Sequence, residues 1–101
     1  MVYRIRVQKN RPSADLAFWE EALRIRMIEA GYLLVSEERV HSGDREGNLV
    51  EFTAAGNEAD ATYLIAIFVM NRQLLVVEAA GDVEDFGPHR AAIIDAVEAI
   101  F

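Results

Sequence analysis

An uncharged run, Thr62–Met70, constrains the fold of this chain more than any other stretch. Apolar side chains occupy both odd and even positions of the run, and successive side chains of a β-strand point to opposite faces of its sheet. Such a strand has no side that can face water, so it predicts a sheet covered on both faces. Asn71 and Arg72 then suit a two-residue turn, and Gln73–Ala80 returns almost as apolar. We therefore expect residues 62–80 to form the central hairpin of the sheet.

The N-terminal third of the chain predicts an edge strand followed by a helix. Residues 2–8 alternate apolar and polar side chains, which is typical of a half-exposed strand at an edge. A helix is expected over residues 13–30, with Ser13 as its N-cap. Gly31 follows at the position where a left-handed residue commonly ends a helix.

The remaining segments predict two more strands and a closing helix. We expect strands at 32–41 and 49–55, joined by a solvated loop over 42–48. The last helix is expected to have Asp85 as its N-cap and Pro88 in its first turn, where the missing N–H costs nothing. The order β-α-β-β-β-β-α predicts an α+β fold: an antiparallel β-sheet with helices packed on it.

Composition limits the classes of function. The 101 residues carry a formal net charge of −7 and no cysteine. This length suits a single domain, 1–101, and the lack of cysteine excludes thiolate metal sites and cysteine nucleophiles. The acidic balance argues against a nucleic-acid partner. No apolar run is long enough for a transmembrane segment, so we expect a cytoplasmic protein, or one of the periplasm or cell envelope if an export signal has been removed.

The chemistry-bearing residues predict no enzyme. We expect no catalytic residue, no metal ligand and no cofactor, because His41 and His89 stand apart without converging partners. No serine lies in a G-x-S-x-G context, and the acidic loop 42–48 lacks the spacing of a calcium loop. Gly47 and the other loop glycines mark turns rather than a phosphate-binding loop.

One candidate interaction surface lies on the helix expected over 13–30. The stripe that should face the sheet consists of Leu16, Trp19, Leu23 and Met27. Phe18, Ile25 and Ile28 lie roughly opposite, within an arc of about 80° at helical periodicity, and a clustered apolar patch is more often an interaction surface than an accident. Arg4 and Arg6 belong to the same basic end of the chain. They can bind an anion or, as is commoner, pair with carboxylates across the sheet.

From Trp19 onward, the order of elements resembles a known family. The matching segments are the helix leading into Gly31-Tyr32, the strand ending Glu37-Glu38-Arg39-Val40, the Tyr63–Met70 strand, the partner strand ending Glu78-Ala79-Ala80, and the closing helix that begins around Glu84-Asp85-Phe86. Over roughly residues 16–101 this pattern is similar to the Mog1/PsbP-like fold, particularly to its small bacterial members, often exported or lipoproteins. The resemblance implies an antiparallel sheet between helices. It also implies a role as a binding or assembly factor, as in members that act on a small GTPase or a photosystem.

Two functions remain open. The leading hypothesis is a non-enzymatic binding or accessory domain of the bacterial cell envelope, with a protein partner and an oligomeric state that the sequence leaves open. The alternative is a carrier that holds a small apolar ligand between the helix 13–30 and the sheet. A carrier gains thermal stability from its ligand by mass action, whereas a partner-binding domain does not respond to small molecules.

Overall fold

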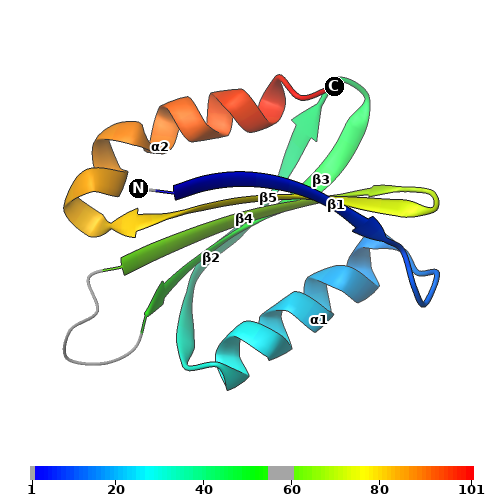
Figure 1. Cartoon of the computed structure of the whole chain (residues 1–101), viewed down its shortest axis with the longest axis horizontal. Coiled ribbons are helices and arrows are strands. Elements are labelled where there is room, and N and C mark those ends of the chain that lie inside the picture. The colour runs from blue at the N-terminus through cyan, green and yellow to red at the C-terminus, as the bar shows by residue number, and fades with distance from the viewer. Residues whose placement is uncertain (1, 55–60) are drawn as a thin grey trace.

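The computed structural model describes residues 2–54 and 61–101, which form a five-stranded antiparallel sheet and two helices in the expected order. The elements are β1 (Val2–Lys9), α1 (Leu16–Glu29), β2 (Tyr32–Ser42), β3 (Arg45–Ala54), β4 (Ala61–Met70), β5 (Gln73–Asp82) and α2 (Val83–Glu98). The strands lie side by side in the order β1-β5-β4-β3-β2. Strand β4 is therefore central, while β1 and β2 form the two edges. Figure 1 shows α1 and α2 on opposite sides of this sheet.

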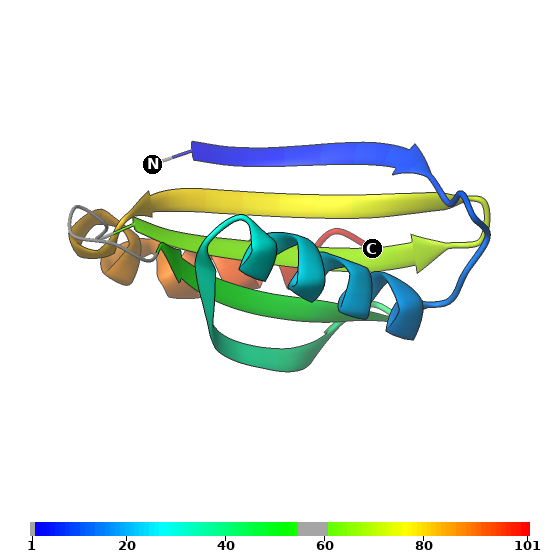
Figure 2. The same cartoon turned by 90° about the horizontal axis from the view of Figure 1, so that it is seen from below.

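The central hairpin is buried on both faces, as the uncharged run Thr62–Met70 and the largely apolar return strand predict. On one face, α1 covers a core made of Val50, Phe52, Ile65, Ile67, Leu74 and Val76. On the other face, α2 covers a second core that includes Leu49, Leu64, Ala66, Phe68 and Val77. Helix α1 packs on β2, β3 and β4, whereas α2 packs on β2, β4 and β5, so β1 extends beyond the main area of both helices (Figure 2).

The expected sheet-facing side of α1 is confirmed, and α2 also packs on the sheet through one face. The side chains of α1 that pack on the sheet are Leu16, Trp19, Leu23 and Met27. Those of α2 that are buried are Phe86, Ile93 and Val97. Both sets recur at the three- and four-residue spacing of one helical face, which is why the sequence identifies them.

The N-cap of α1 differs from the expectation: Asp15, rather than Ser13, caps the helix by accepting a hydrogen bond from the backbone N–H of Phe18 at 3.1 Å. The reason lies in Asn10, whose side chain is bonded to both backbone groups of Ala14. Its Oδ1 accepts from the Ala14 N–H at 3.1 Å, and its Nδ2 donates to the Ala14 carbonyl at 3.0 Å. These bonds hold the connection in a non-helical conformation through Ala14, so the helix begins only after Asp15.

Asn10 also joins three separate parts of the chain. Its Oδ1 accepts a hydrogen bond from the indole Nε1 of Trp19 at 2.7 Å, and its Nδ2 donates to the Asn71 carbonyl at 2.9 Å. Its backbone N–H donates to the carbonyl of Arg72 at 2.9 Å. This buried amide therefore ties the start of α1 to the β4–β5 turn, where Asn71 adopts a φ of 60°.

The expected loop over 42–48 is mostly strand. The turn consists of Gly43 and Asp44, and β3 begins directly afterwards at Arg45. Gly47 lies inside β3, is buried, and faces Phe68 of β4. A Cβ atom at Gly47 would lie 2.7 Å from two ring carbons of Phe68. Glycine is therefore needed here because the Phe68 ring packs against the strand backbone, and not because the chain turns. Strand β3 ends at Ala54, and the last residue of the strand expected over 49–55 lies outside the described residues.

Helix α2 begins earlier than expected. Strand β5 runs directly into it, Asp82 rather than Asp85 is the N-cap residue, and Pro88 lies inside the helix beyond its first turn. At its other end, the buried hydroxyl of Ser42 donates to the Glu98 carbonyl at 3.0 Å and accepts from the Phe101 N–H at 2.7 Å. The end of α2 is thereby fixed to the β2–β3 turn. Within the described residues, neither helix combines the length and the apolar character needed to cross a membrane.

Candidate functional site

The described residues do not bring together a group of side chains that could hold a metal ion. In residues 2–54 and 61–101, no group of three histidine, aspartate or glutamate side chains is placed to hold a metal ion. His41 is exposed on β2, and His89 is exposed on α2. The residues that the sequence singled out lie on two surfaces of the described structure.

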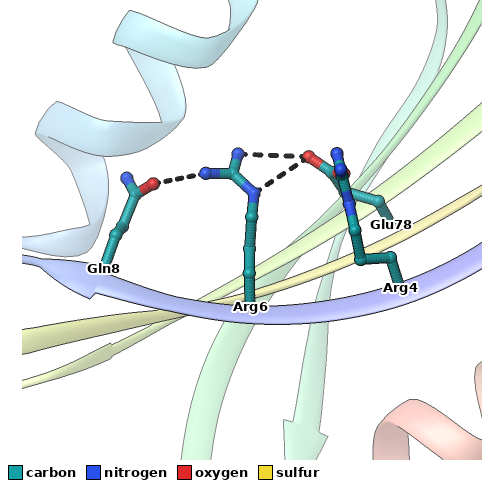
Figure 3. A network of polar contacts seen from close by, with 4 residues as sticks. All are labelled: Arg4, Arg6, Gln8 and Glu78. Carbon is teal, nitrogen blue, oxygen red and sulfur yellow. Dashed lines mark hydrogen bonds and ion pairs between the residues drawn. The ribbon is translucent and has the colours of Figure 1, made fainter.

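The first surface is an ionic network on the α1 side of β1 (Figure 3). Arg4 lies directly opposite Glu78 of β5, and its Nε donates to Oε2 of that carboxylate at 3.0 Å, with a second contact from Nη2. Arg6 binds the other carboxylate oxygen, with Nη2 at 3.1 Å and Nε at 3.3 Å from Oε1. The remaining Nη1 of Arg6 donates to the side chain of Gln8. One buried carboxylate thus holds two largely exposed guanidinium groups.

This network shifts the pKa values of its members. Burial acts to raise the pKa of Glu78, but the hydrogen bonds and positive charges of Arg4 and Arg6 outweigh burial and place the pKa below its ordinary value of 4.5. Burial and the negative charge of Glu78 raise the pKa of Tyr63, and the hydrogen bonds that Arg4 donates to Glu78 raise the pKa of Arg4. A depressed carboxyl pKa contributes stability that is complete above the unfolded-state value and is lost as the pH falls through the folded-state value.

The cross-strand pairing of Arg4 and Arg6, which the sequence favours over anion binding, is confirmed. The structure does not place these arginines with Phe18, Ile25 and Ile28 in one continuous site. The arginines lie on the edge strand β1, and Arg6 lines the sheet-facing side of α1, whereas the three apolar residues lie on the outward side of that helix.

The second surface is this outward side of α1. Phe18, Ile25 and Ile28 are 45%, 50% and 54% exposed, as expected. At the start of β2, which follows α1 in the chain, Leu33, Leu34 and Val35 are also 56%, 43% and 54% exposed. We call these six residues the α1–β2 apolar surface.

The sequence did not predict the exposure of the β2 part of the α1–β2 apolar surface. Apolar residues of both parities at 32–35 predict a covered strand. The strand is instead at an edge of the sheet, with an irregular register between Leu34 and Ser36. An edge strand has one neighbour only, so side chains near its free side stay open to solvent. A run of only four apolar residues does not distinguish an edge strand from a central strand.

Ion pairs fix the side of α1 that faces β2. Arg24 of α1 binds Glu37 of β2 with Nη1 to Oε2 at 2.8 Å, and Glu20 of α1 is paired with Arg39 of β2. Asn48 of β3 donates to the same Glu37 carboxylate at 3.0 Å. With one side packed on the sheet and another engaged by these pairs, Phe18, Ile25 and Ile28 stay exposed on the outward side of α1.

A cavity of about 120 Å³ lies between α1 and the sheet, where the sequence places the ligand of a carrier. Trp19, Leu23, Ile65 and Val76 contribute its apolar walls, and Arg6 contributes to its rim. Ligand sites for small molecules usually have volumes of about 300–1,000 Å³. The cavity is therefore too small for such a ligand in this conformation.

Comparisons with known proteins show the fold. No family model matches the sequence, and no curated protein matches it. Several solved structures are similar, among them the following two. The solution structure of cyanobacterial PsbP (CyanoP) from Synechocystis has a TM-score of 0.71 and 8% sequence identity, covering 90% of this chain and 61% of that one. The crystal structure of PA94 from Pseudomonas aeruginosa, a protein of unknown function described as a putative regulator, has a TM-score of 0.74 and 12% identity, covering 100% of this chain and 84% of that one.

These similarities establish a PsbP/Mog1-like fold, an antiparallel sheet with two helices, as the sequence predicts. The chain spans less than two thirds of the length of the cyanobacterial PsbP. At such low identity the likeness concerns the fold alone, and function must be argued from the surfaces of this chain.

Proposed function

We propose that this chain is a non-enzymatic binding domain that contacts a protein partner through the α1–β2 apolar surface. The observation that carries the proposal is the exposure of its six members, Phe18, Ile25, Ile28, Leu33, Leu34 and Val35. Single exposed apolar residues are ordinary on protein surfaces. Six large exposed side chains on α1 and at the start of the strand that follows it go beyond such scattered exposure and favour an interaction site.

The proposed surface stands on a rigid platform. Phe18 packs edge-to-face on Trp19, with ring centroids 5.0 Å apart, and Trp19 is in turn held by its hydrogen bond to Asn10. The ion pair between Arg24 and Glu37 fixes α1 against β2. A rigid aromatic side chain loses little conformational entropy on binding, which makes Phe18 the expected anchor of the interface.

A binding role also agrees with the fold analogy, since one of the similar structures is described as a putative regulator. A location in the bacterial cell envelope belongs to the same proposal and rests on the family resemblance. Fractionation of the source cells, followed by detection of the native chain, tests it. The carrier alternative is disfavoured by the small volume of the cavity between α1 and the sheet.

The experiment uses the double substitution Phe18→Ser with Ile25→Ser, and measures melting temperature and solution mass. An interaction surface predicts an unchanged melting temperature for the monomer and a loss of self-association or of partner binding. Leu23→Ser, which removes a side chain packed on the sheet, serves as the core control and should lower the melting temperature markedly.

A photo-crosslinking residue at position 25, introduced in the source cells, identifies the partner as a discrete adduct that the Phe18→Ser substitution removes. Two results contradict the proposal. One is a large fall in the melting temperature of the double variant, which assigns the surface to the core. The other is a chain that neither self-associates nor yields an adduct at position 25.

A further inference from the structure

The two edges of the sheet differ in how well they are protected from further strand pairing. Strand β2 has an irregular register after Leu34, and the adjacent charges of Glu37 and Arg39 are bonded to α1. Bulges and charges of this kind are devices that blunt an edge. Strand β1 has no bulge in the part of the chain that the structure describes, since it pairs with β5 in one unbroken register from Val2 to Lys9, and the charges of Arg4 and Arg6 are bonded to Glu78 of β5 rather than to a covering helix. Its outer backbone groups are therefore open to another strand.

Three apolar side chains of β1 lie on the α2 side and are about half exposed. Tyr3, Ile5 and Val7 are 44%, 49% and 54% exposed. Beside them lies an open groove of about 350 Å³ between β1 and α2, which Tyr3 shares with Ala92 and Ala96. Alanines on the helix leave room for side chains of an added strand to lie over this groove.

The charges along β1 are positive in a chain whose net charge is −7. Arg4 and Arg6 share the single carboxylate of Glu78. At the end of the strand, Lys9, Arg11 and Arg72 surround an open cavity of about 590 Å³. None of the described residues that line this cavity is acidic. The edge thus combines an apolar face, a basic face and a basic cavity at its end.

We propose that β1 binds an extended segment of a protein partner as a further strand, and that this segment alternates apolar residues with aspartate or glutamate. Its apolar side chains lie over the groove beside Tyr3 and Ile5, its acidic ones lie next to Arg4 and Arg6, and an acidic end enters the cavity at Arg11. The added strand satisfies the outer backbone groups of β1, which is the basis of recognition by β-augmentation.

A second copy of this chain fits the edge less well. Antiparallel pairing of β1 with itself about Ile5 places Arg4 of one copy opposite Arg6 of the other, and like charges directly opposite each other are destabilising. The proposal rests on the proposed function in that it treats the chain as a binding domain, but it concerns a different surface from the α1–β2 apolar surface.

The test titrates the intact chain with a synthetic peptide of alternating valine and glutamate, blocked at both ends and as long as β1. Backbone amide exchange is followed residue by residue by NMR. Slower exchange of β1 amides is expected, with little change in β2. A peptide with lysine in place of glutamate should bind at least about tenfold more weakly, because its charges repel those of the edge. Added salt should weaken binding of the glutamate peptide.

Matched protein variants locate the contact. The double substitution Arg11→Glu with Arg72→Glu should weaken binding of the glutamate peptide about tenfold, because it reverses the charge of the cavity. Arg45→Glu, at the turn of the opposite edge, should leave binding unchanged. The double variant Phe18→Ser with Ile25→Ser should also bind the peptide normally. This variant therefore distinguishes failure of the proposal for the α1–β2 apolar surface from failure of the proposal for β1.

Three results overturn the proposal. The first is unchanged amide exchange in β1 at millimolar glutamate peptide. The second is equal binding of the glutamate and lysine peptides. The third is that inorganic phosphate or free glutamate perturbs Arg11 and Arg72 as the peptide does while β1 is unaffected, which would make the cavity a site for small anions only.

Discussion

The contact between Gly47 and Phe68 can be tested by adding a single methyl group. A Cβ at position 47 would lie 2.7 Å from both Cδ1 and Cε1 of Phe68 and 2.8 Å from the carbonyl oxygen of Ile67. Favourable contacts between carbon atoms lie at about 3.5–4.0 Å. The ring has little room to withdraw, since Phe68 is fully buried and packs edge-to-face on Phe101 with centroids 5.4 Å apart. The Ile67 oxygen belongs to the backbone of the central strand.

Gly47→Ala should therefore destabilise the fold. Overpacking of a close-packed core costs about 1–3 kcal/mol. The loss of glycine flexibility in the unfolded chain offsets about 0.4–1 kcal/mol of this, so we expect a net loss of about 1–2 kcal/mol. Gly87→Ala is the matched control: this glycine lies in α2, and a Cβ there would meet no atom within 4 Å. It should stabilise the protein by about 0.5–1 kcal/mol.

Urea denaturation followed by circular dichroism gives the free energy of unfolding of each variant by linear extrapolation. In a domain of this size, 1 kcal/mol corresponds to a shift of about 4–8 °C in melting temperature. Gly47→Ala should lower the free energy of unfolding by a smaller amount in a Phe68→Leu background, where the ring is absent. The reasoning is refuted if Gly47→Ala is at least as stable as the wild type, or if its penalty is the same with leucine at position 68.

Two further predictions concern the polar groups inside the fold. Asn10→Ala should lower the free energy of unfolding, measured by urea titration, by about 1–3 kcal/mol, because it leaves the Trp19 indole N–H and neighbouring backbone groups without their hydrogen-bond partner. Ser13→Ala should leave the free energy of unfolding nearly unchanged, and equal effects of the two substitutions would contradict the bonding described for Asn10. Below pH 4.5, the free energy of unfolding of the wild type should fall more steeply than that of Glu78→Gln, because only the wild type must protonate a carboxylate whose pKa is depressed in the folded state. Parallel stability–pH profiles of the two proteins would show that Arg4 and Arg6 do not stabilise the ionised Glu78.

The elements with a strong hydrophobic period could be predicted from the sequence. The run Thr62–Met70, apolar at both parities over nine residues, predicts a strand covered on both faces, and the stripe through Trp19 predicts the face of α1 that packs on the sheet. The resemblance to a family added the expectation of a PsbP/Mog1-like fold, which the structural comparisons confirm. The outward position of Phe18, Ile25 and Ile28 follows from the same helical period.

What the sequence did not predict depends on partners that are distant in the chain. Gly47 has the local context of a turn, and only the opposing ring of Phe68 shows that it is a packing glycine of a strand. Ser13 and Asp15 are both good N-cap types, and the side chain of Asn10 decides between them. Glu20 is buried because Arg39 of another element pairs with it, and no local pattern shows that pair.

The first strand of the chain pairs with the last one, and this has a kinetic consequence. Val2 lies opposite Ala80 and Lys9 opposite Gln73, whereas β2 to β5 are joined successively to their neighbours. Closing so long a loop costs more entropy than forming local hairpins, so the β2–β5 meander should assemble before β1 docks. Among the described residues, neither buried core includes a member of β1. The strand can therefore detach while both cores stay intact, which makes it the unit of lowest local stability in the sheet and the one whose amides exchange fastest.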